Sequence, residues 1–169
     1  IKSFREFKYF TGLKVIGNWT FSVCHSLQSI IIPDSVTSIG KWAFSKCTSL
    51  QSISIPDSVT SIENQAFYHC KSLQSISIPN SVTSIGGGTF YQCESLKSVN
   101  IPDSVTSIGE DIFYGCKSLQ TIYISRRHPL LRELKYIKNC KFVDPSEVNE
   151  SISLGMNKHV QGRYSSKIA

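Results

Sequence analysis

The sequence predicts a solenoid rich in β-structure, in which short parallel strands stack in coils of 23 residues. The first observation is a strict internal period: the segment 50–72, LQSISIPDSVTSIENQAFYHCKS, recurs with few changes on both sides. The second is that apolar residues keep the same places in every unit, so that stacked units bury them together. The third is a proline after each predicted strand, which ends the strand because it lacks an N–H group. The repeat units are 4–26, 27–49, 50–72, 73–95 and 96–118, followed by a last strand at 119–125.

The first unit is degenerate but aligns with the others. Phe4 takes the place of Leu27, and Cys24 takes the place of Cys47. A terminal repeat is expected to be atypical, because no neighbour covers one of its faces. We therefore expect residues 4–26 to form a cap, or a join to a preceding domain. The chain begins in mid-pattern without a signal peptide, and we expect it to be a mature or excised piece of a longer protein.

Each full unit begins with a strand of about six residues, such as 27–32, whose β-branched side chains favour extended structure. Pro33 ends this strand, and Asp34 then favours a turn, because its side chain can accept hydrogen bonds from nearby backbone N–H groups. The following segment VTSI, at 36–39 in this unit, alternates apolar and polar residues. That alternation predicts a second short strand with its valine and isoleucine facing the interior.

A corner is predicted after the second strand, where Gly40, Gly86 and Gly109 stand at the same repeat position. We expect these glycines to have positive φ, as a tight corner requires. The motif FxxC follows, as in Phe44 to Cys47, and its spacing of three matches one helical turn. It is too short for more than one turn of 3₁₀ or α-helix.

Stacking of the units places equivalent apolar residues in columns that only neighbouring units can bury. We expect the interior to be formed by these columns, since a single unit cannot cover its own apolar face. Three of these columns run through Leu27, Leu50, Leu73, Leu96 and Leu119; through Ile30, Ile53, Ile76, Val99 and Ile122; and through Phe44, Phe67, Phe90 and Phe113.

Five of the six cysteines form another column, with one cysteine per unit. These are Cys24, Cys47, Cys70, Cys93 and Cys116. Adjacent strands are about 4.8 Å apart, which is within bridging range, but parallel side chains rarely reach the torsion of a disulfide. We therefore expect reduced, buried cysteines that act as small apolar residues. A zinc site is not expected because no CxxC pair occurs, and Cys140, outside the column, is the best candidate for thiol labelling.

The period fails after residue 125, and we assign 126–169 to a C-terminal cap and tail. The segment 129–137, PLLRELKYI, places its leucines on one face of a helix, and we expect a short helical cap that closes the solenoid. Cys140, Phe142 and Val143 are expected to extend this cover. The residues DPSE at 144–147 predict a turn or the start of a weak helix, and no period is visible beyond them.

The charge distribution argues against nucleic acid as a partner. The net charge is +6, but the tail carries nine basic and four acidic residues, whereas residues 1–125 carry nine basic and eight acidic ones. The folded body is therefore almost neutral, and a nucleic-acid-binding protein is expected to carry a basic surface on its body. No apolar run approaches the length of a membrane span, about 18 residues.

The best candidate binding surface is the outer face of the first strands. It is expected to carry hydroxyl and amide groups with almost no charge. Ile31, Asn100 and Tyr123 interrupt its serine columns, and an exposed isoleucine and tyrosine are suited to anchor a partner. The alternative is a solvated sheet whose serines reflect repeat duplication. The candidate residues are Gln28, Ile31, Gln51, Ser52, Ser54, Gln74, Ser75, Ser77, Lys97, Ser98, Asn100, Gln120 and Tyr123.

No pattern of catalytic or metal-binding residues is present. A column of Asp34, Asp57, Asn80 and Asp103 offers one oxygen ligand per coil, and we interpret it as a turn signal rather than a calcium site. The four histidines show no spacing that suggests a catalytic triad, and the Gly86–Gly88 run lacks the lysine of a phosphate-binding loop. We expect no enzymatic activity, no cofactor and no metal.

The repeat pattern LxSIxIPxSVTSIGxxAFxxCxS resembles the BspA-like leucine-rich repeats of bacterial cell-surface proteins. The resemblance covers about residues 4–125, and FREFKYFTGLKVIG is similar to the entry segment of such arrays. It implies a curved right-handed leucine-rich repeat superhelix, export to the cell surface or secretion, and adhesion to host matrix proteins or other bacteria. It implies no catalytic residues.

Two functions remain open at this point. In the first, the chain is a surface-exposed, non-enzymatic module that binds a protein or glycan through the sheet face. In the second, it is a structural spacer that displays another domain. We expect a monomer, or a part of a longer chain.

Overall fold

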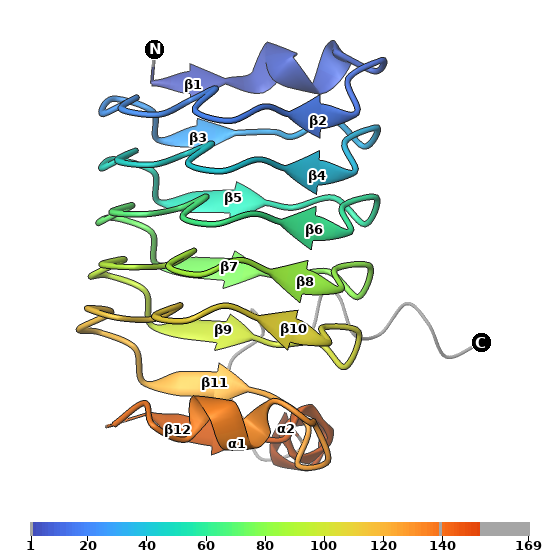
Figure 1. The fold of residues 1–169 in the computed structure, drawn as a ribbon, viewed down its shortest axis with the longest axis vertical. Helices are drawn as coiled ribbons and strands as arrows, with labels where there is room; N and C mark the ends of the chain where they lie inside the picture. Colours follow the sequence, from blue (N-terminus) through green and yellow to red (C-terminus); the bar gives the residue numbers. More distant parts are fainter. Residues whose placement is uncertain (1, 139, 153–169) are drawn as a thin grey trace.

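The predicted solenoid is confirmed by the computed structural model, which describes residues 2–138 and 140–152. The coils stack along the long axis of the molecule, from β1 at one end to α1, β12 and α2 at the other (Figure 1). Successive strands pair in parallel at equivalent repeat positions, so that Ser52 lies beside Ser75 and Ser75 beside Ser98. The register therefore follows the 23-residue period.

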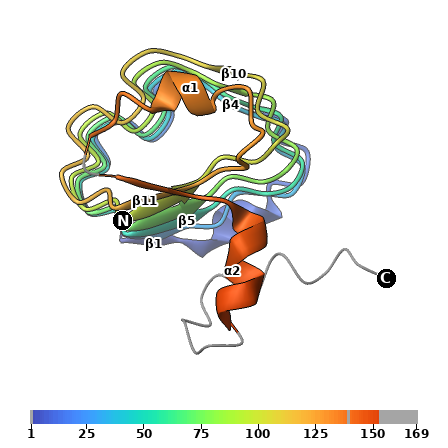
Figure 2. The same ribbon diagram turned by 90° about the horizontal axis from the view of Figure 1, so that it is seen from below.

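Two five-stranded parallel sheets form opposite sides of each coil (Figure 2). We call the sheet with the order β12-β11-β9-β7-β5 the front sheet and the sheet with the order β10-β8-β6-β4-β2 the back sheet; these names do not refer to the view in Figure 1. The front strands are β5 (Ser52–Ser54), β7 (Ser75–Ser77), β9 (Ser98–Asn100), β11 (Thr121–Tyr123) and β12 (Lys141–Val143). The back strands are β2 (Val15–Ile16), β4 (Ser38–Ile39), β6 (Ser61–Ile62), β8 (Ser84–Ile85) and β10 (Ser107–Ile108).

The first coil differs from the rest, as the degenerate unit predicted. β1 (Ser3–Phe4) pairs with β3 (Ser29–Ile30), and the isolated bridge between Ile31 and Ser54 links this pair to the front sheet. The 3₁₀ helix η1 (Arg5–Tyr9) follows β1 and buries Phe7. The Phe7 ring packs edge-on against Phe21, with ring centroids 5.2 Å apart, and so covers this end of the core.

The predicted apolar columns form one continuous core. Leu50, Leu73, Phe44, Phe67 and Phe90 are all fully buried. The rings of the phenylalanine column stack almost in parallel, with neighbouring ring centroids 5.4 to 5.8 Å apart along Phe44, Phe67, Phe90 and Phe113. In the phenylalanine column each side chain therefore contacts the same residue type one coil away.

The C-terminal end of the core is covered by α1 (Leu131–Leu134), which is shorter than the predicted helix. Leu130 and Leu134 are buried against the last coil. The buried His128 ring accepts a hydrogen bond from the Leu130 N–H through Nδ1, and its Nε2 lies 3.2 Å from the Pro102 carbonyl oxygen. β12 continues the front sheet beyond residue 125, and α2 (Pro145–Ile152) follows it. The predicted tail beyond residue 152 lies outside the described residues.

The expected positive φ at Gly40, Gly86 and Gly109 is wrong, because none of these glycines has a positive φ. The structure shows another reason for glycine at this position, which is close contact between coils. A Cβ atom on Gly86 would lie 2.3 Å from the Asn64 backbone nitrogen. One on Gly109 would lie 2.2 Å from the Gly87 nitrogen.

Left-handed corners occur instead at two other positions of the repeat, and most of the residues at these positions are not glycine. Among the described residues, every positive φ falls at one of these two positions: Trp19, Trp42, Gln65, Gly88 and Asp111 at the first, and Val23, Lys46, His69, Gln92 and Gly115 at the second. Between the corners, alternate N–H groups donate to the next coil, as from Trp42, Phe44 and Lys46 to the carbonyls one repeat later. The predicted helical turns are present as single i→i+3 turns, such as Ser45 N–H to the Trp42 carbonyl at 3.0 Å.

Val23 is the least suitable residue at a left-handed corner, since β-branched side chains strongly disfavour positive φ. Its φ is 63° and its side chain is exposed. Replacing Val23 with asparagine, which tolerates this conformation, is expected to raise the free energy of unfolding by about 1 kcal/mol. Urea denaturation measures the change. Val15→Asn, at an exposed valine with ordinary φ, is the matched control, and an equal rise there would contradict the explanation.

The cysteine column is buried at Cys47, Cys70 and Cys93, and half-buried at Cys24 and Cys116. All six cysteines are free thiols. From Cys47 to Cys116, each column Sγ donates to a phenylalanine carbonyl of the preceding coil at 3.0 to 3.2 Å. Burial raises the pKa of the Cys47 and Cys116 thiols to about 12. The thiols are therefore protonated and unreactive at neutral pH.

Thiol labelling of the native protein is expected to modify Cys140, outside the column, before Cys47, Cys70 and Cys93, because Cys140 is only half-buried and those three are buried. Mass spectrometry after a short incubation with a maleimide identifies the modified residues. Rapid labelling at Cys47, Cys70 and Cys93 would contradict the packing, whereas labelling of these residues in urea is expected and serves as the control.

Candidate functional site: the outer face of the front sheet

The structure places the predicted binding residues together on the outer face of the front sheet and at its entry. One column of candidate residues immediately precedes the strands of the front sheet, and its backbone groups form hydrogen bonds from coil to coil, as from the Gln51 N–H to the Gln28 carbonyl at 3.2 Å. Its side chains, from Gln28, Gln51, Gln74, Lys97 and Gln120, are all exposed. Ser52, Ser54 and Ser75 are also exposed, while Ser77 and Ser98 are half-buried. Their role in binding stays a prediction.

The chemistry of this face is that of uncharged hydrogen-bonding groups at regular intervals. Serine hydroxyls and glutamine amides both donate and accept hydrogen bonds. Parallel pairing repeats these groups about every 4.8 Å along the solenoid. Only Lys97 adds a formal charge within the candidate set. The face can therefore hydrogen-bond to polar ligands of either donor or acceptor character, and it does not select for charge.

The three expected anchors differ in the structure. Ile31 is 41% exposed and presents apolar surface at the N-terminal end of the face. Tyr123 is half-buried between its register partners Asn100 and Val143 on the neighbouring strands. The side-chain amide of Asn100 accepts from the Ile78 N–H at 2.9 Å and donates to the Ile78 carbonyl at 2.8 Å. Asn100 therefore holds two coils together, and Ile31 and Tyr123 are the better anchors.

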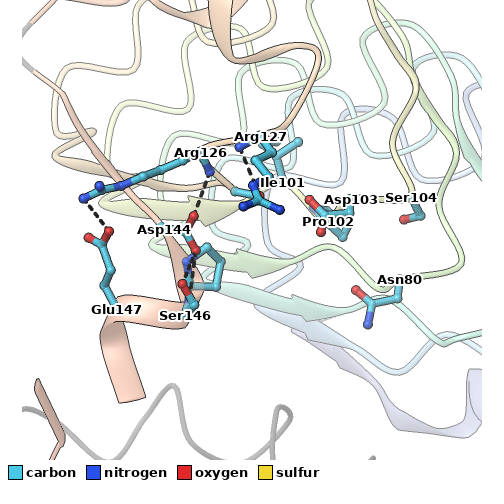
Figure 3. A pocket seen from close by; sticks show the side chains of 12 residues that line it. Asn80, Ile101, Pro102, Asp103, Ser104, Arg126, Arg127, Asp144, Ser146 and Glu147 are labelled. Carbon is cyan, nitrogen blue, oxygen red and sulfur yellow. Dashed lines mark hydrogen bonds and ion pairs between the residues drawn. The ribbon is translucent and has the colours of Figure 1, made fainter. Parts of the chain in front are cut away.

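A pocket that the sequence did not predict lies past the carboxyl ends of β7, β9, β11 and β12 (Figure 3). Its volume is about 790 Å³. The segment 101–104 forms one wall, and the segments 125–127 and 144–147 form the other. α2 leaves this wall and points away from the coil on the side of the front sheet (Figure 2). The pocket therefore lies at the C-terminal edge of the candidate face.

Asp144 organises the wall that leads into α2. Its carboxylate accepts hydrogen bonds from the Arg126 N–H at 2.8 Å and from the Ser146 N–H and hydroxyl at 3.0 and 2.7 Å. The Arg126 guanidinium forms an ion pair with Glu147. The hydrogen bond from Arg126, followed by those from Ser146, lowers the pKa of the Asp144 carboxyl to about 2. These contacts fix the start of α2 against the end of β11.

The depressed pKa of Asp144 predicts a stability change in acid. A carboxyl group with a lower pKa in the folded state stabilises the fold above the unfolded pKa of about 4, and this stabilisation is lost as the pH falls toward 2. NMR signals of the Arg126 and Ser146 amides are therefore expected to shift with a midpoint near pH 2. The Asp144→Asn variant is the control and should lack this transition. A midpoint near pH 4 in the parent chain would contradict the hydrogen-bond network.

An aromatic column on the outside of the coils was also missed by the sequence analysis. It runs through Trp19, Trp42, Tyr68, Tyr91 and Tyr114, with ring centroids 4.8 to 5.2 Å apart. Each coil contributes one ring, but the tryptophans stand three repeat positions before the tyrosines. A comparison of residues at one repeat position at a time therefore does not reveal the aromatic column. Three of its four ring pairs are stacked and the Trp42–Tyr68 pair is edge-to-face, and aromatic pairs of both kinds contribute about 0.5–1.5 kcal/mol each beyond area burial.

Within the part of the chain that the structure describes, no cluster of three or more His, Cys, Asp or Glu residues is placed to hold a metal ion. Across the same residues, no helix has both the length and the apolar character needed to cross a membrane.

Stacked 23-residue coils, with parallel strands on two opposite sides, an apolar interior and irregular turns between the strands, define a leucine-rich repeat solenoid protein. Six copies of the model for the BspA type leucine rich repeat region match residues 2–120. The chain therefore belongs to the BspA-type leucine-rich repeat family, as the repeat pattern predicted. A search of curated proteins found no match.

Solved structures of bacterial proteins share this fold. A leucine-rich repeat protein of T. pallidum is 37% identical, with a TM-score of 0.65, over 66% of this chain and 52% of its own. A leucine-rich cell surface protein of Faecalibacterium prausnitzii is 38% identical, with a TM-score of 0.68, over 72% of this chain and 31% of its own. The pneumococcal vaccine antigen PcpA, at 20% identity and a TM-score of 0.68, covers 91% of this chain and 39% of its own, and shows the fold alone.

This chain thus spans about a third to a half of the length of these structures.

Proposed function

We propose that the chain is a non-enzymatic binding module, displayed at the cell surface or secreted, that adheres to a host extracellular protein or glycan through the front sheet. The observation that supports this most strongly is the alignment of uncharged polar side chains on one face, beside the exposed Ile31 and the half-buried Tyr123. Apolar anchors surrounded by polar groups are typical of protein interfaces.

The proposal is tested by binding of the purified chain to immobilised matrix proteins and glycans, measured by surface plasmon resonance. The double variant Ile31→Ser and Tyr123→Ala is expected to weaken binding by at least about tenfold, because each lost anchor contributes about 1–2 kcal/mol. The double variant Val15→Ser and Tyr136→Ala removes an exposed aliphatic side chain and an exposed tyrosine elsewhere on the surface, and serves as the control.

Two results would overturn the proposal. Equal binding by the parent chain and the front-sheet variant would place the site elsewhere on the coil. Absence of binding across the whole panel would favour the alternative function, a spacer that displays another domain.

A further inference from the structure

We propose that the pocket at the C-terminal edge of the front sheet binds a neutral saccharide unit through its vicinal hydroxyl groups. This inference rests on the proposed function and specifies its ligand as a glycan. The pocket volume of about 790 Å³ falls within the usual range of small-ligand sites, about 300–1,000 Å³. Its lining comes from four segments that are far apart in the sequence, namely Asn80, 101–104, 125–127 and 144–147, so no short sequence motif predicts it.

Part of the pocket is a fixed wall whose polar groups already have partners. Asp144 accepts hydrogen bonds from the Arg126 N–H and from Ser146, and the Arg126 guanidinium pairs with Glu147. Figure 3 shows this network on the side of the pocket next to α2. These groups are oriented before any ligand arrives, which reduces the entropy lost on binding.

Other polar groups of the pocket are available to a ligand. Asn80, Asp103 and Arg127 line it with exposed side chains, and no ion pair among the described residues involves Asp103 or Arg127. Carboxylate, amide and guanidinium groups each present two hydrogen-bonding atoms side by side, and this geometry matches a pair of neighbouring hydroxyl groups. Asn80 and Asp103 lie across the pocket from Asp144 and Glu147, whereas Arg127 follows Arg126 on the fixed wall (Figure 3).

Ser104 supplies an independent indication of a missing hydrogen-bond partner. Its Oγ is the one buried side-chain nitrogen or oxygen within the described residues that has no partner, and Ser104 lines the pocket. At the same repeat position, Ser58 and Ser81 donate to the Val36 and Val59 carbonyls, both at 2.6 Å. A buried hydroxyl without a partner costs free energy. Rotation of the Ser104 side chain toward the pocket would allow a ligand hydroxyl to provide this partner.

The charges and the apolar residues of the pocket favour a neutral sugar over an acidic or a purely apolar ligand. Two arginines face three carboxylates from Asp103, Asp144 and Glu147, so an acidic ligand meets an excess of negative charge. Ile101 and Pro102 line the pocket but are buried, so the pocket offers little apolar surface to a ligand. Most of the remaining lining is polar, which suits a polyhydroxylated ligand.

The position of the pocket connects it to the front sheet. It lies beyond the carboxyl ends of β9, β11 and β12, so a glycan with its terminal sugar in the pocket continues over the columns of hydroxyl and amide groups. The pocket then fixes the end of the chain, and the sheet contacts its following units.

The test is an NMR titration of the ¹⁵N-labelled protein with glucose, galactose, mannose, N-acetylglucosamine and their short oligomers. At least one neutral sugar is expected to shift amides of segments 101–104, 125–127 and 144–147. Asp103→Ala and Arg127→Ala are each expected to weaken this binding by about tenfold or more. Asp57→Ala, at the repeat position of Asp103 but outside the pocket lining, is the matched control and should bind as the parent chain does.

The inference is overturned if none of these sugars shifts the pocket amides, or if Asp103→Ala and Arg127→Ala both bind as the parent chain does. Preference for glucuronic acid or glucosamine over glucose would contradict the assignment of a neutral ligand. These failures are distinct from failure of the proposed function, because the Ile31 and Tyr123 variants test the sheet face against the whole panel of partners.

Discussion

Replacement of Phe67 by alanine is expected to lower the free energy of unfolding by about 3–5 kcal/mol. Phe67 is fully buried at the centre of the phenylalanine column, with its ring stacked on Phe44 at 5.4 Å and on Phe90 at 5.8 Å. The substitution removes both stacking contacts and leaves a cavity between coils that cannot collapse, because backbone hydrogen bonds fix the coil spacing. Urea denaturation followed by circular dichroism measures the loss.

The matched control is Tyr114→Ala, at the end of the exposed aromatic column. Tyr114 is 58% exposed and stacks on Tyr91 with ring centroids 4.8 Å apart. Its removal deletes one stacked pair without opening a cavity, and we expect a loss of about 1 kcal/mol. Similar losses for the two variants would show that ring stacking, rather than filling of the interior, determines the stability of the solenoid.

Gly86→Ala is expected to destabilise the fold by about 1–3 kcal/mol, although it adds only one methyl group. The added Cβ would lie 2.3 Å from the Asn64 nitrogen and 2.6 Å from the Glu63 carbonyl carbon, and both atoms belong to the backbone of the preceding coil. Relief of this contact requires the two coils to separate. Separation weakens the hydrogen bond that the Gly86 N–H donates to the Ile62 carbonyl, which is 2.8 Å long. Thermal and urea denaturation measure the effect.

Gly12→Ala is the control for this substitution, because a Cβ at Gly12 has no heavy atom within 4 Å. It is expected to leave stability unchanged or to raise it slightly, since alanine restricts the unfolded chain more than glycine does. A Gly86→Ala variant as stable as Gly12→Ala would contradict the close contact between coils.

The fold could be predicted from the sequence because one physical requirement acts on every unit. Leu50, Ile53 and Phe67 recur at fixed spacing since each must contact its equivalent one coil away. The conformation of the corners could not be predicted in the same way. Val23, Lys46 and Gln92 adopt positive φ because the hydrogen bonds to the next coil hold them there, and their side chains carry no signal of it.

The candidate face followed from strand alternation, but its surroundings did not. Asn100 was expected to contact a ligand because it interrupts a serine column, yet its amide is bound to the backbone of Ile78. The pocket combines Asp103 from a repeat with Arg127 and Asp144 from the segment after the repeats, where the period gives no guide. Only the structure shows that these residues lie together.

The central claim is that the front sheet and its C-terminal pocket form the binding side of the molecule. Hydrogen–deuterium exchange of the chain, alone and with a partner identified from the matrix and glycan panel, tests this claim most directly. We predict slower exchange in β5, β7, β9 and β11 and in segments 101–104 and 144–147, with unchanged exchange in the back sheet. Protection confined to the back sheet, or to the turns that carry the aromatic column, would contradict the claim.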